Sequence, residues 1–213
     1  MVGYARYLDS IADLTAGKEL VSSGMTQEVQ RCRCALERAA AGDIVALVSS
    51  GDPGIYGMAG LALELAEAEQ IDVPIEIVPG VTAASAAAAA LGAPLMLDFA
   101  VVSLSDLLVP WETIRSRLQA VAAADLVVAL YNPRSKKRVR HLEEAAAIFR
   151  GVRPGQTPVG IVTAAGQEDQ RVVTTDLERL LEHEVDMRSV VIIGNSTTRF
   201  IDGGMVTARG YEL

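Results

Sequence analysis

The chain has 213 residues, of which 50% are hydrophobic and 22% are charged. This apolar content is enough for a buried core and excludes an intrinsically disordered protein. The 27 acidic residues outnumber the 19 basic residues, and the formal net charge at pH 7 is −8. A protein that coats nucleic acid is normally basic, so we expect no nucleic-acid partner.

No segment of the sequence predicts export or membrane insertion. The N-terminal residues lack the basic region and apolar run of a signal peptide. Residues 77–97 are uncharged and long enough to span a bilayer, but prolines and glycines interrupt them and alanine dominates. We therefore expect a buried helix there and no membrane partner. Cys32 and Cys34 match no zinc or redox spacing, so we expect no metal and a reducing, cytoplasmic location.

The first half of the chain alternates apolar runs with helical segments. The end of a strand is predicted at Met1–Tyr4, further strands at Ile44–Val48 and Ile75–Val78, and helices at Leu61–Glu69 and Thr82–Leu91. Continuous apolar strands joined by helices are typical of a parallel sheet that is covered on both faces.

The second half continues the same α/β pattern. The connection Gly92–Asp98 is the best candidate for a boundary, so we expect two α/β lobes, residues 1–95 and 96–213. Short antiparallel edge strands are predicted at Arg171–Thr174 and Met205–Ala208. The other predicted elements are the strands Ala100–Leu104, Leu126–Tyr131, Gly160–Thr163 and Val190–Ile193, and the helices Trp111–Ala124 and Lys136–Phe149.

The strongest indication of chemistry is the loop Ser49–Gly57, which follows one predicted strand and precedes a helix. Ligands bind at this edge of open α/β sheets, and regularly spaced glycines let the backbone approach a ligand closely. The spacing is neither a dinucleotide-binding fingerprint nor a P-loop. Asp52 would repel a phosphate, but it suits ribose hydroxyls, an ammonium or a sulfonium. The alternative is an ordinary Asp-Pro-Gly turn.

A second strand-to-helix loop precedes the alanine-rich helix. Thr82 stands at the start of that helix, where its hydroxyl and the free amides face the same sheet edge. A helix cap without a ligand is the alternative interpretation.

Positive charge is concentrated in residues 134–140, where five of seven residues are basic. Basic residues at a helix N-terminus oppose the helix dipole, which suggests an anionic ligand. We expect Arg134 to contact that ligand and Lys137 to belong to a solvated helix face. His141 and His183 lie in charged helical segments, and we expect both at the surface.

Several motifs resemble those of a known family. In one-letter code, S-G-D-P-G-I-Y-G from Ser50 and V-P-G-V-T-A-A-S from Val78 resemble the tetrapyrrole (corrin/porphyrin) methylases, which use S-adenosyl-L-methionine. V-G-Y-x-x-Y, S-S-G-M-T-x-E-V-x-R-C, S-L-S-D-L-L-V-P-W and A-L-Y-N-P-R-S-K-K-R are similar to the branch that methylates carbon 17 of precorrin-3B, with ring contraction to precorrin-4, in cobalamin biosynthesis. The resemblance covers nearly the whole chain.

The resemblance implies two α/β lobes with the cofactor in the cleft between them, a homodimer, and a small-molecule tetrapyrrole substrate rich in carboxylates. The implied S-adenosyl-L-methionine contacts are Ser50, Gly51, Asp52, Ile55, Thr82, Ala83, Tyr131, Asn132 and Ala165. The expected substrate contacts are Arg134, Lys136 and Ser105. Ring contraction calls for a proton donor or acceptor, for which the candidates are Asp106, Ser105, Tyr131 and Thr26.

The chain departs from the family pattern at its start. Family members begin with a strand that ends in a G-x-G-P-G loop, whereas this sequence starts at what resembles their second strand, Val2–Tyr4. We therefore expect a tetrapyrrole methylase-like fold without that first strand. Two alternative functions stay open. One is a tetrapyrrole methylase acting at another carbon or on a cobalt-bearing macrocycle, and the other is a non-catalytic tetrapyrrole or S-adenosyl-L-methionine binding protein.

Overall fold

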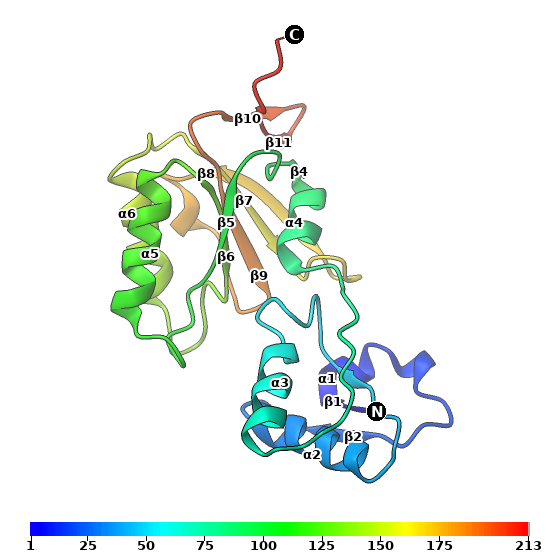
Figure 1. Ribbon diagram of the computed structural model, residues 1–213. Helices are drawn as coiled ribbons and strands as arrows, with labels where there is room; N and C mark the ends of the chain where they lie inside the picture. The colour runs from blue at the N-terminus through cyan, green and yellow to red at the C-terminus, as the bar shows by residue number, and fades with distance from the viewer. Residues whose placement is uncertain (213) are drawn as a thin grey trace. The chain divides into compact units, whose positions relative to one another are not determined.

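The computed structural model describes residues 1–212 and has a mixed α/β architecture, as the sequence predicts (Figure 1). The chain forms two compact units, Met1–Thr82 and Ala83–Leu213. This division falls before helix α4 (Ala83–Leu91), whereas the sequence analysis placed it between residues 95 and 96. Helix α4 groups with the second unit because it packs against the large sheet of that unit.

The first unit contains a small parallel sheet. Strand β1 (Val2–Tyr4) lies at its centre, with β2 (Val21–Ser23) on one side and β3 (Leu47–Val48) on the other. The register pairs Val2 with Val21 and with Leu47. The helical elements of this unit are α1 (Ala5–Asp9), the 3₁₀ helix η1 (Ala12–Leu14), α2 (Glu28–Ala40) and α3 (Ala59–Ala68).

Two predicted strands of the first unit differ from the structure. The strand expected at Ile44–Val48 is shortened to Leu47–Val48, and Ile75–Val78 is not a strand. Residues 71–82 run without a turn or bend, but within residues 1–212 they pair with no neighbouring strand. β-Branched residues favour a strand only when a neighbour completes the hydrogen-bond ladder, so the prediction from composition was wrong here.

The second unit is built on a five-stranded sheet in the order β5-β6-β9-β7-β8. A second, three-stranded sheet has the order β10-β11-β4. The strands are β4 (Gly92–Ala93), β5 (Phe99–Ser103), β6 (Val127–Tyr131), β7 (Pro158–Thr163), β8 (Arg171–Asp176), β9 (Ser189–Ile193), β10 (Thr198–Ile201) and β11 (Gly204–Thr207). The helical elements besides α4 are α5 (Trp111–Ala123), α6 (Arg140–Arg150) and the 3₁₀ helix η2 (Leu180–Glu182).

Most predicted elements of this unit are confirmed within a few residues, including the antiparallel edge strand β8. Strand β11 is antiparallel to β10 but parallel to β4, and it lies between them, so the prediction that it is an edge strand was wrong. Another exception is the helix expected from Lys136, which begins only at Arg140. A tight turn replaces its first residues, because Ser135 N–H donates to the Arg138 carbonyl at 3.0 Å and Arg138 N–H donates to Ser135 Oγ at 3.0 Å. Serine favours such a local side-chain bond over a helix interior.

The strand directions place three strand ends at one edge. Strands β5 and β6 are parallel, whereas β9 is antiparallel to both β6 and β7. Strand β7 therefore runs in the same direction as β5 and β6. The carboxyl ends of these three strands, Ser103, Tyr131 and Thr163, lie at the same edge of the sheet.

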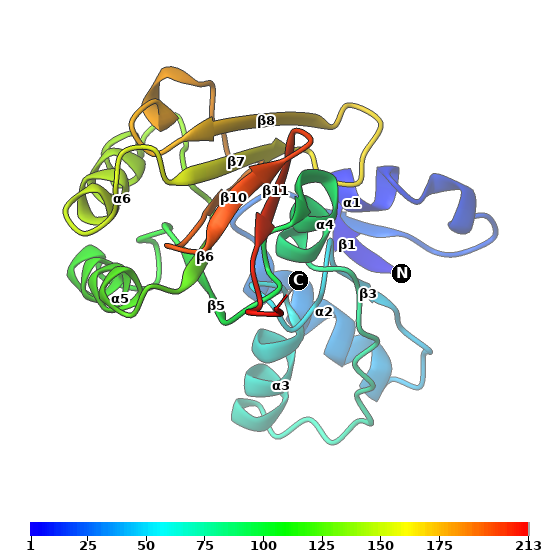
Figure 2. The ribbon, with the colours of Figure 1, turned by 90° about the horizontal axis from the view of Figure 1, so that it is seen from above.

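Helices cover both faces of the large sheet. Helices α5 and α6 lie on one face and α4 lies on the other (Figures 1 and 2). Strand β6 shows the alternation that this arrangement requires, since Val128 and Leu130 pack toward α5 and α6, while Val127 and Ala129 pack toward α4. The uncharged stretch of residues 77–97 noted in the sequence thus contains this covering helix. No helix described within residues 1–212 is long and apolar enough to span a membrane.

Close packing between α4 and β7 generates a stability prediction. A Cβ added at Gly160 would lie 2.3 Å from Leu91 Cδ1, so we expect Gly160→Ala to destabilise the second unit by about 1–3 kcal/mol. Urea unfolding measures this change. Gly60→Ala on α3 is the control, because a Cβ there meets nothing within 4 Å and alanine favours a helix. Equal effects from both variants would contradict the packing argument.

Candidate functional site

The loop after β3 is tied to a second loop of the first unit by one carboxylate. Asp52 Oδ1 accepts a hydrogen bond from Gly54 N–H at 2.8 Å, and its Oδ2 accepts one from Gly80 N–H at 3.0 Å. An ionised carboxylate has about four acceptor positions, so these two bonds leave capacity for a ligand. Asp52 therefore has a folding role, and its predicted ligand contact stays a prediction.

Glycine is required where these two loops meet. A Cβ at Gly80 would lie 2.1 Å from the Gly51 carbonyl oxygen, and one at Gly57 would lie 2.5 Å from the Pro53 carbonyl oxygen. Gly51 also has a φ of +67°, in the left-handed region. Part of the glycine spacing is thus explained by local folding. Ile55, which is predicted to contact the ligand, is 39% exposed and is therefore accessible.

The second unit gathers several predicted residues at the strand-end edge described above. Ser103 is paired with Tyr131 in the β5–β6 register, and Leu104 N–H donates to the Tyr131 carbonyl at 2.9 Å. Tyr131 Oη accepts a hydrogen bond from Ala84 N–H, in the first turn of α4, at 2.6 Å. This bond satisfies one of the amides that a helix start leaves without an intrahelical partner. Because Ala83 precedes Ala84 in the chain, this hydrogen bond also places Ala83 near the Tyr131 side chain.

The loops that leave β5 and β6 are joined by side-chain hydrogen bonds. Asn132 Nδ2 donates to Ser103 Oγ at 3.0 Å, and Ser105 N–H donates to the same oxygen at 3.2 Å. Arg138 Nη2 donates to the Asn132 carbonyl at 2.7 Å. Asn132 itself has a φ of 50°, which asparagine tolerates better than most residues. The structure thus brings together Ser105, Tyr131 and Asn132, and Ala165 follows β7 at the same edge.

An acid–histidine pair near this edge was missed by the sequence analysis. His141 Nε2 lies 3.1 Å from Asp106 Oδ2, and the His141 ring packs against the Trp111 ring with 4.1 Å between centroids. The His141 side chain is only 16% exposed, so the expectation of a surface residue was wrong. His183 is also half-buried, with Nε2 2.9 Å from Thr175 Oγ1. No local spacing signals a contact between side chains 35 positions apart, as in the 106–141 pair.

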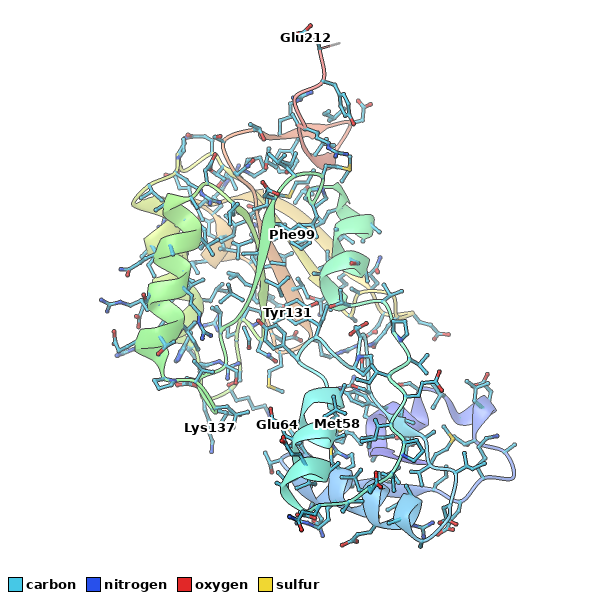
Figure 3. The ribbon with its side chains drawn as sticks, in the orientation of Figure 1. Met58, Glu64, Phe99, Tyr131, Lys137 and Glu212 are labelled. Carbon is cyan, nitrogen blue, oxygen red and sulfur yellow. The ribbon has the colours of Figure 1, made fainter. Side chains whose placement is uncertain are left out.

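The basic residues after β6 have different environments. Arg134 is half-buried and borders a cavity of about 280 Å³. Lys136 and Lys137 are exposed, and Lys137 lies on the loop beyond β6 with its side chain pointing away from the sheet (Figure 3). The cavity is lined by Arg134, Thr163, Arg171, Glu184, Val185 and Asp186.

Thr26, a further candidate for proton transfer, belongs to the first unit. It is exposed, has a φ of 64°, and its hydroxyl donates to the neighbouring Met25 carbonyl at 2.6 Å. Ser50, Gly51, Asp52, Ile55 and Thr82 belong to the same unit. In the part of the chain that the structure describes, no group of three or more His, Cys, Asp or Glu side chains is placed to hold a metal ion.

A family model defines the class of protein to which this fold and this site belong. Residues 2–181 match the model described as Tetrapyrrole (Corrin/Porphyrin) Methylases. The chain belongs to this family, as its loop motifs predicted.

Two relatives narrow the resemblance within the family. The chain is 48% identical over 213 residues to a probable cobalt-factor III C(17)-methyltransferase of Salmonella typhimurium, covering all of this chain and 88% of the relative. It is 44% identical over 203 residues to a precorrin-3B C(17)-methyltransferase of a Sinorhizobium species, covering 94% of this chain and 80% of the relative. Other relatives are longer, and the chain spans 40% and 60% of two of them.

Solved structures agree with this placement. The methyltransferase CobJ superimposes with a TM-score of 0.91 at 38% identity, over 97% of this chain and 87% of that one. Uroporphyrin-III C-methyl transferase from Thermus thermophilus, complexed with S-adenyl homocysteine, has a TM-score of 0.62 at 27% identity, over 85% of this chain and 78% of that one.

The Asp52 carboxylate provides a test of how the first unit is held together. Asp52→Ala removes the acceptor of both the Gly54 and the Gly80 amide, so we expect both amides to exchange with solvent about tenfold faster or more. Hydrogen exchange measured by NMR reports each amide separately. Asp72→Ala, which changes an exposed carboxylate of the same unit, is the control and should leave both rates unchanged. Unaltered exchange in Asp52→Ala would rule out this cross-link.

Proposed function

We propose that this chain is an S-adenosyl-L-methionine-dependent C-methyltransferase that methylates carbon 17 of precorrin-3B, with ring contraction, in cobalamin biosynthesis. The observation that carries this proposal is the match along the whole chain to relatives named as C(17)-methyltransferases. Their names include both a cobalt-factor and a precorrin substrate. The cobalt-bearing macrocycle is therefore the nearest alternative substrate.

The residues of the first unit that we propose for cofactor binding fit the chemistry of S-adenosyl-L-methionine. A sulfonium, an ammonium and ribose hydroxyls all favour a nearby carboxylate, and Asp52 keeps acceptor positions beyond its two backbone bonds. Ser50 and Gly51 are exposed beside it, and Ile55 offers partly exposed apolar surface for an adenine ring. Thr82 is the last residue of this unit and completes the set.

In the second unit, we propose cofactor contacts from Ala83, Tyr131, Asn132 and Ala165. The evidence is that Tyr131 holds the start of α4, while Asn132 is fixed by Ser103. A site that positions a ligand requires such immobilised groups, because misplacement by about 1 Å can reduce the rate about 100-fold. The homodimer implied by the resemblance and the cytoplasmic location inferred from the two cysteines are part of the same proposal.

Methyl transfer from a sulfonium to a carbon is a displacement that depends on alignment and on exclusion of water. The bound cofactor supplies the methyl group, so the protein needs little acid–base chemistry for this step. Ring contraction requires proton movement, and Asp106 is the candidate with a titratable neighbour. Its carboxylate is 41% exposed, and His141 lies behind it at 3.1 Å. The pair can hold a proton at Asp106 Oδ2 or His141 Nε2.

Product mass tests the proposed activity. Two parallel reactions contain the full chain and S-adenosyl-L-methionine. One also contains precorrin-3B, and the other contains its cobalt-bearing equivalent. We expect one of these macrocycles to gain the mass of one CH2 unit, because the methyl group replaces a proton, together with formation of S-adenosyl homocysteine. Binding of both ligands without any added methyl would identify a non-catalytic binding protein instead. Methylation at another carbon, located by NMR, would identify a different tetrapyrrole methylase.

The basic residues in the segment 134–140 generate a second prediction. Arg134→Ala should weaken macrocycle binding about tenfold or more, because charge-assisted bonds to substrate carboxylates are worth about 1.5–3 kcal/mol. Added salt should weaken binding further in the wild type than in this variant. Titration of macrocycle absorbance measures both effects, and cofactor affinity should barely change. Lys137→Ala is the matched control, since Lys137 is exposed. Equal effects of the two substitutions would show that the basic residues form only a solvated surface and do not bind the substrate.

A further inference from the structure

The loop 164–170 connects β7 to β8 and carries Ala165, one of the residues that we propose for cofactor binding. Ala165 is half-buried and packs against the same apolar cluster as Ala83 and Tyr131, two further proposed contacts. This cluster lies between α4 and the large sheet. The conformation of the loop therefore decides where Ala165 lies relative to the other two residues.

The backbone at the start of this loop adopts an uncommon conformation. Ala164 is buried and has a φ of 56°, in the left-handed region that residues other than glycine seldom occupy. Its N–H donates to the Arg188 carbonyl at 3.0 Å, and its carbonyl accepts a hydrogen bond from Gln167 N–H at 3.0 Å. Such a strained backbone persists only where its surroundings hold it, and strained residues cluster at ligand sites.

The Arg188 side chain supplies further contacts that hold the loop. Arg188 directly precedes β9, the strand that pairs with β7. Its Nη1 donates to Asp169 Oδ2 at 2.7 Å and its Nη2 donates to Asp169 Oδ1 at 2.7 Å, which makes the ion pair bidentate. Nη2 also donates to Gln167 Oε1 at 2.8 Å. One residue thus holds the start of the loop through its carbonyl and the far side through its guanidinium.

Arg188 is itself fixed by its neighbours. Its N–H donates to Asp186 Oδ1 at 2.8 Å, and Ser189 Oγ donates to the same oxygen at 2.9 Å. Ser189 Oγ also lies 2.8 Å from Oγ1 of Thr163, the last residue of β7, in a buried contact. The Arg188 side chain is only 32% exposed. The contacts to the loop therefore start from a residue that the sheet already immobilises.

We propose that Arg188 is a positioning residue for the cofactor, and that its bonds to Asp169 and Gln167 hold Ala165 where the cofactor binds. This inference rests on the proposed function, in which Ala165 contacts S-adenosyl-L-methionine. Without these bonds, the strained turn at Ala164 loses its external support and the loop exchanges among other conformations. The apparent dissociation constant then rises in inverse proportion to the fraction of molecules that remain competent to bind.

The same hairpin contains a matched ion pair without such a role. Arg179 donates from Nε and Nη2 to Asp176 Oδ2, at 3.0 and 2.7 Å. Asp176 is paired with Pro158, the first residue of β7, so this ion pair lies at the opposite end of the hairpin from Ala165. Its loss should leave the loop 164–170 unchanged.

Cofactor affinity tests the proposal, measured on the full chain by calorimetric titration with S-adenosyl homocysteine. We expect Arg188→Gln and Asp169→Asn each to weaken binding about fivefold or more. The double variant should bind about as well as Arg188→Gln alone, because both changes remove the same ion pair. Arg179→Gln is the matched control and should bind like the wild type. Equal affinities of Arg188→Gln and Arg179→Gln would overturn the proposal.

A second set of measurements separates positioning from a structural role. Exposed ion pairs contribute little to global stability, so the urea midpoint of Asp169→Asn should barely change. Without cofactor, the Gly166 and Gln167 amides should exchange about fivefold faster or more in this variant, as measured by NMR. The KM for S-adenosyl-L-methionine should rise with little change in kcat, because bound cofactor restores the loop. Faster exchange with unaltered cofactor affinity would contradict the positioning role.

The wild-type chain distinguishes failure of this inference from failure of the proposed function. If the wild type does not bind S-adenosyl homocysteine, the cofactor assignment is wrong and the role of Arg188 is wrong with it. If the wild type binds it and Asp169→Asn binds it equally well, only the role of Arg188 is wrong.

Discussion

The parallel register of β5 and β6 is the constraint on which the candidate site of the second unit depends. It places Ser103 beside Tyr131, so that the two loops leaving these strands start next to each other. The Tyr131 hydroxyl then holds the first turn of α4 through Ala84, and Asn132 is bound to Ser103. One pairing between strands thus positions a helix start, an amide side chain and two loops. A slip of one residue would turn each of these side chains to the opposite face.

The opposite edge of the same sheet is fixed by a buried arginine. Arg153 donates from Nη1 to the Gly194 carbonyl at 2.5 Å and from Nη2 to the Leu126 carbonyl at 2.8 Å, which connects the end of β9 to the start of β6. Its guanidinium also lies 4.7 Å from the centroid of the Phe149 ring. Burial lowers the pKa of Arg153, but an arginine remains charged at any physiological pH. This anchor lies at the edge opposite the strand ends that carry the candidate site.

The two units differ in how completely their sheets are formed. In the second unit, helices cover both faces of five hydrogen-bonded strands, and small residues such as Gly160 allow α4 to pack closely. In the first unit, residues 71–82 pair with no strand of the described chain, and Asp52 accepts a hydrogen bond from Gly80 near the end of this segment. The Asp52 carboxylate therefore has two compatible roles, because its bonds to Gly54 and Gly80 shape the loop that we propose for cofactor binding.

The sequence by itself determined the family, the α/β class and most elements of the second unit. Runs such as Leu126–Tyr131 are long, apolar and bounded by turn residues, so local periodicity was sufficient to predict them. Only the tertiary structure decided the rest. Ile75–Val78 has strand composition but no partner, because a ladder requires a neighbour that composition cannot supply. The contact between Asp106 and His141 depends on where α6 begins and how it packs beside α5, which no local spacing encodes.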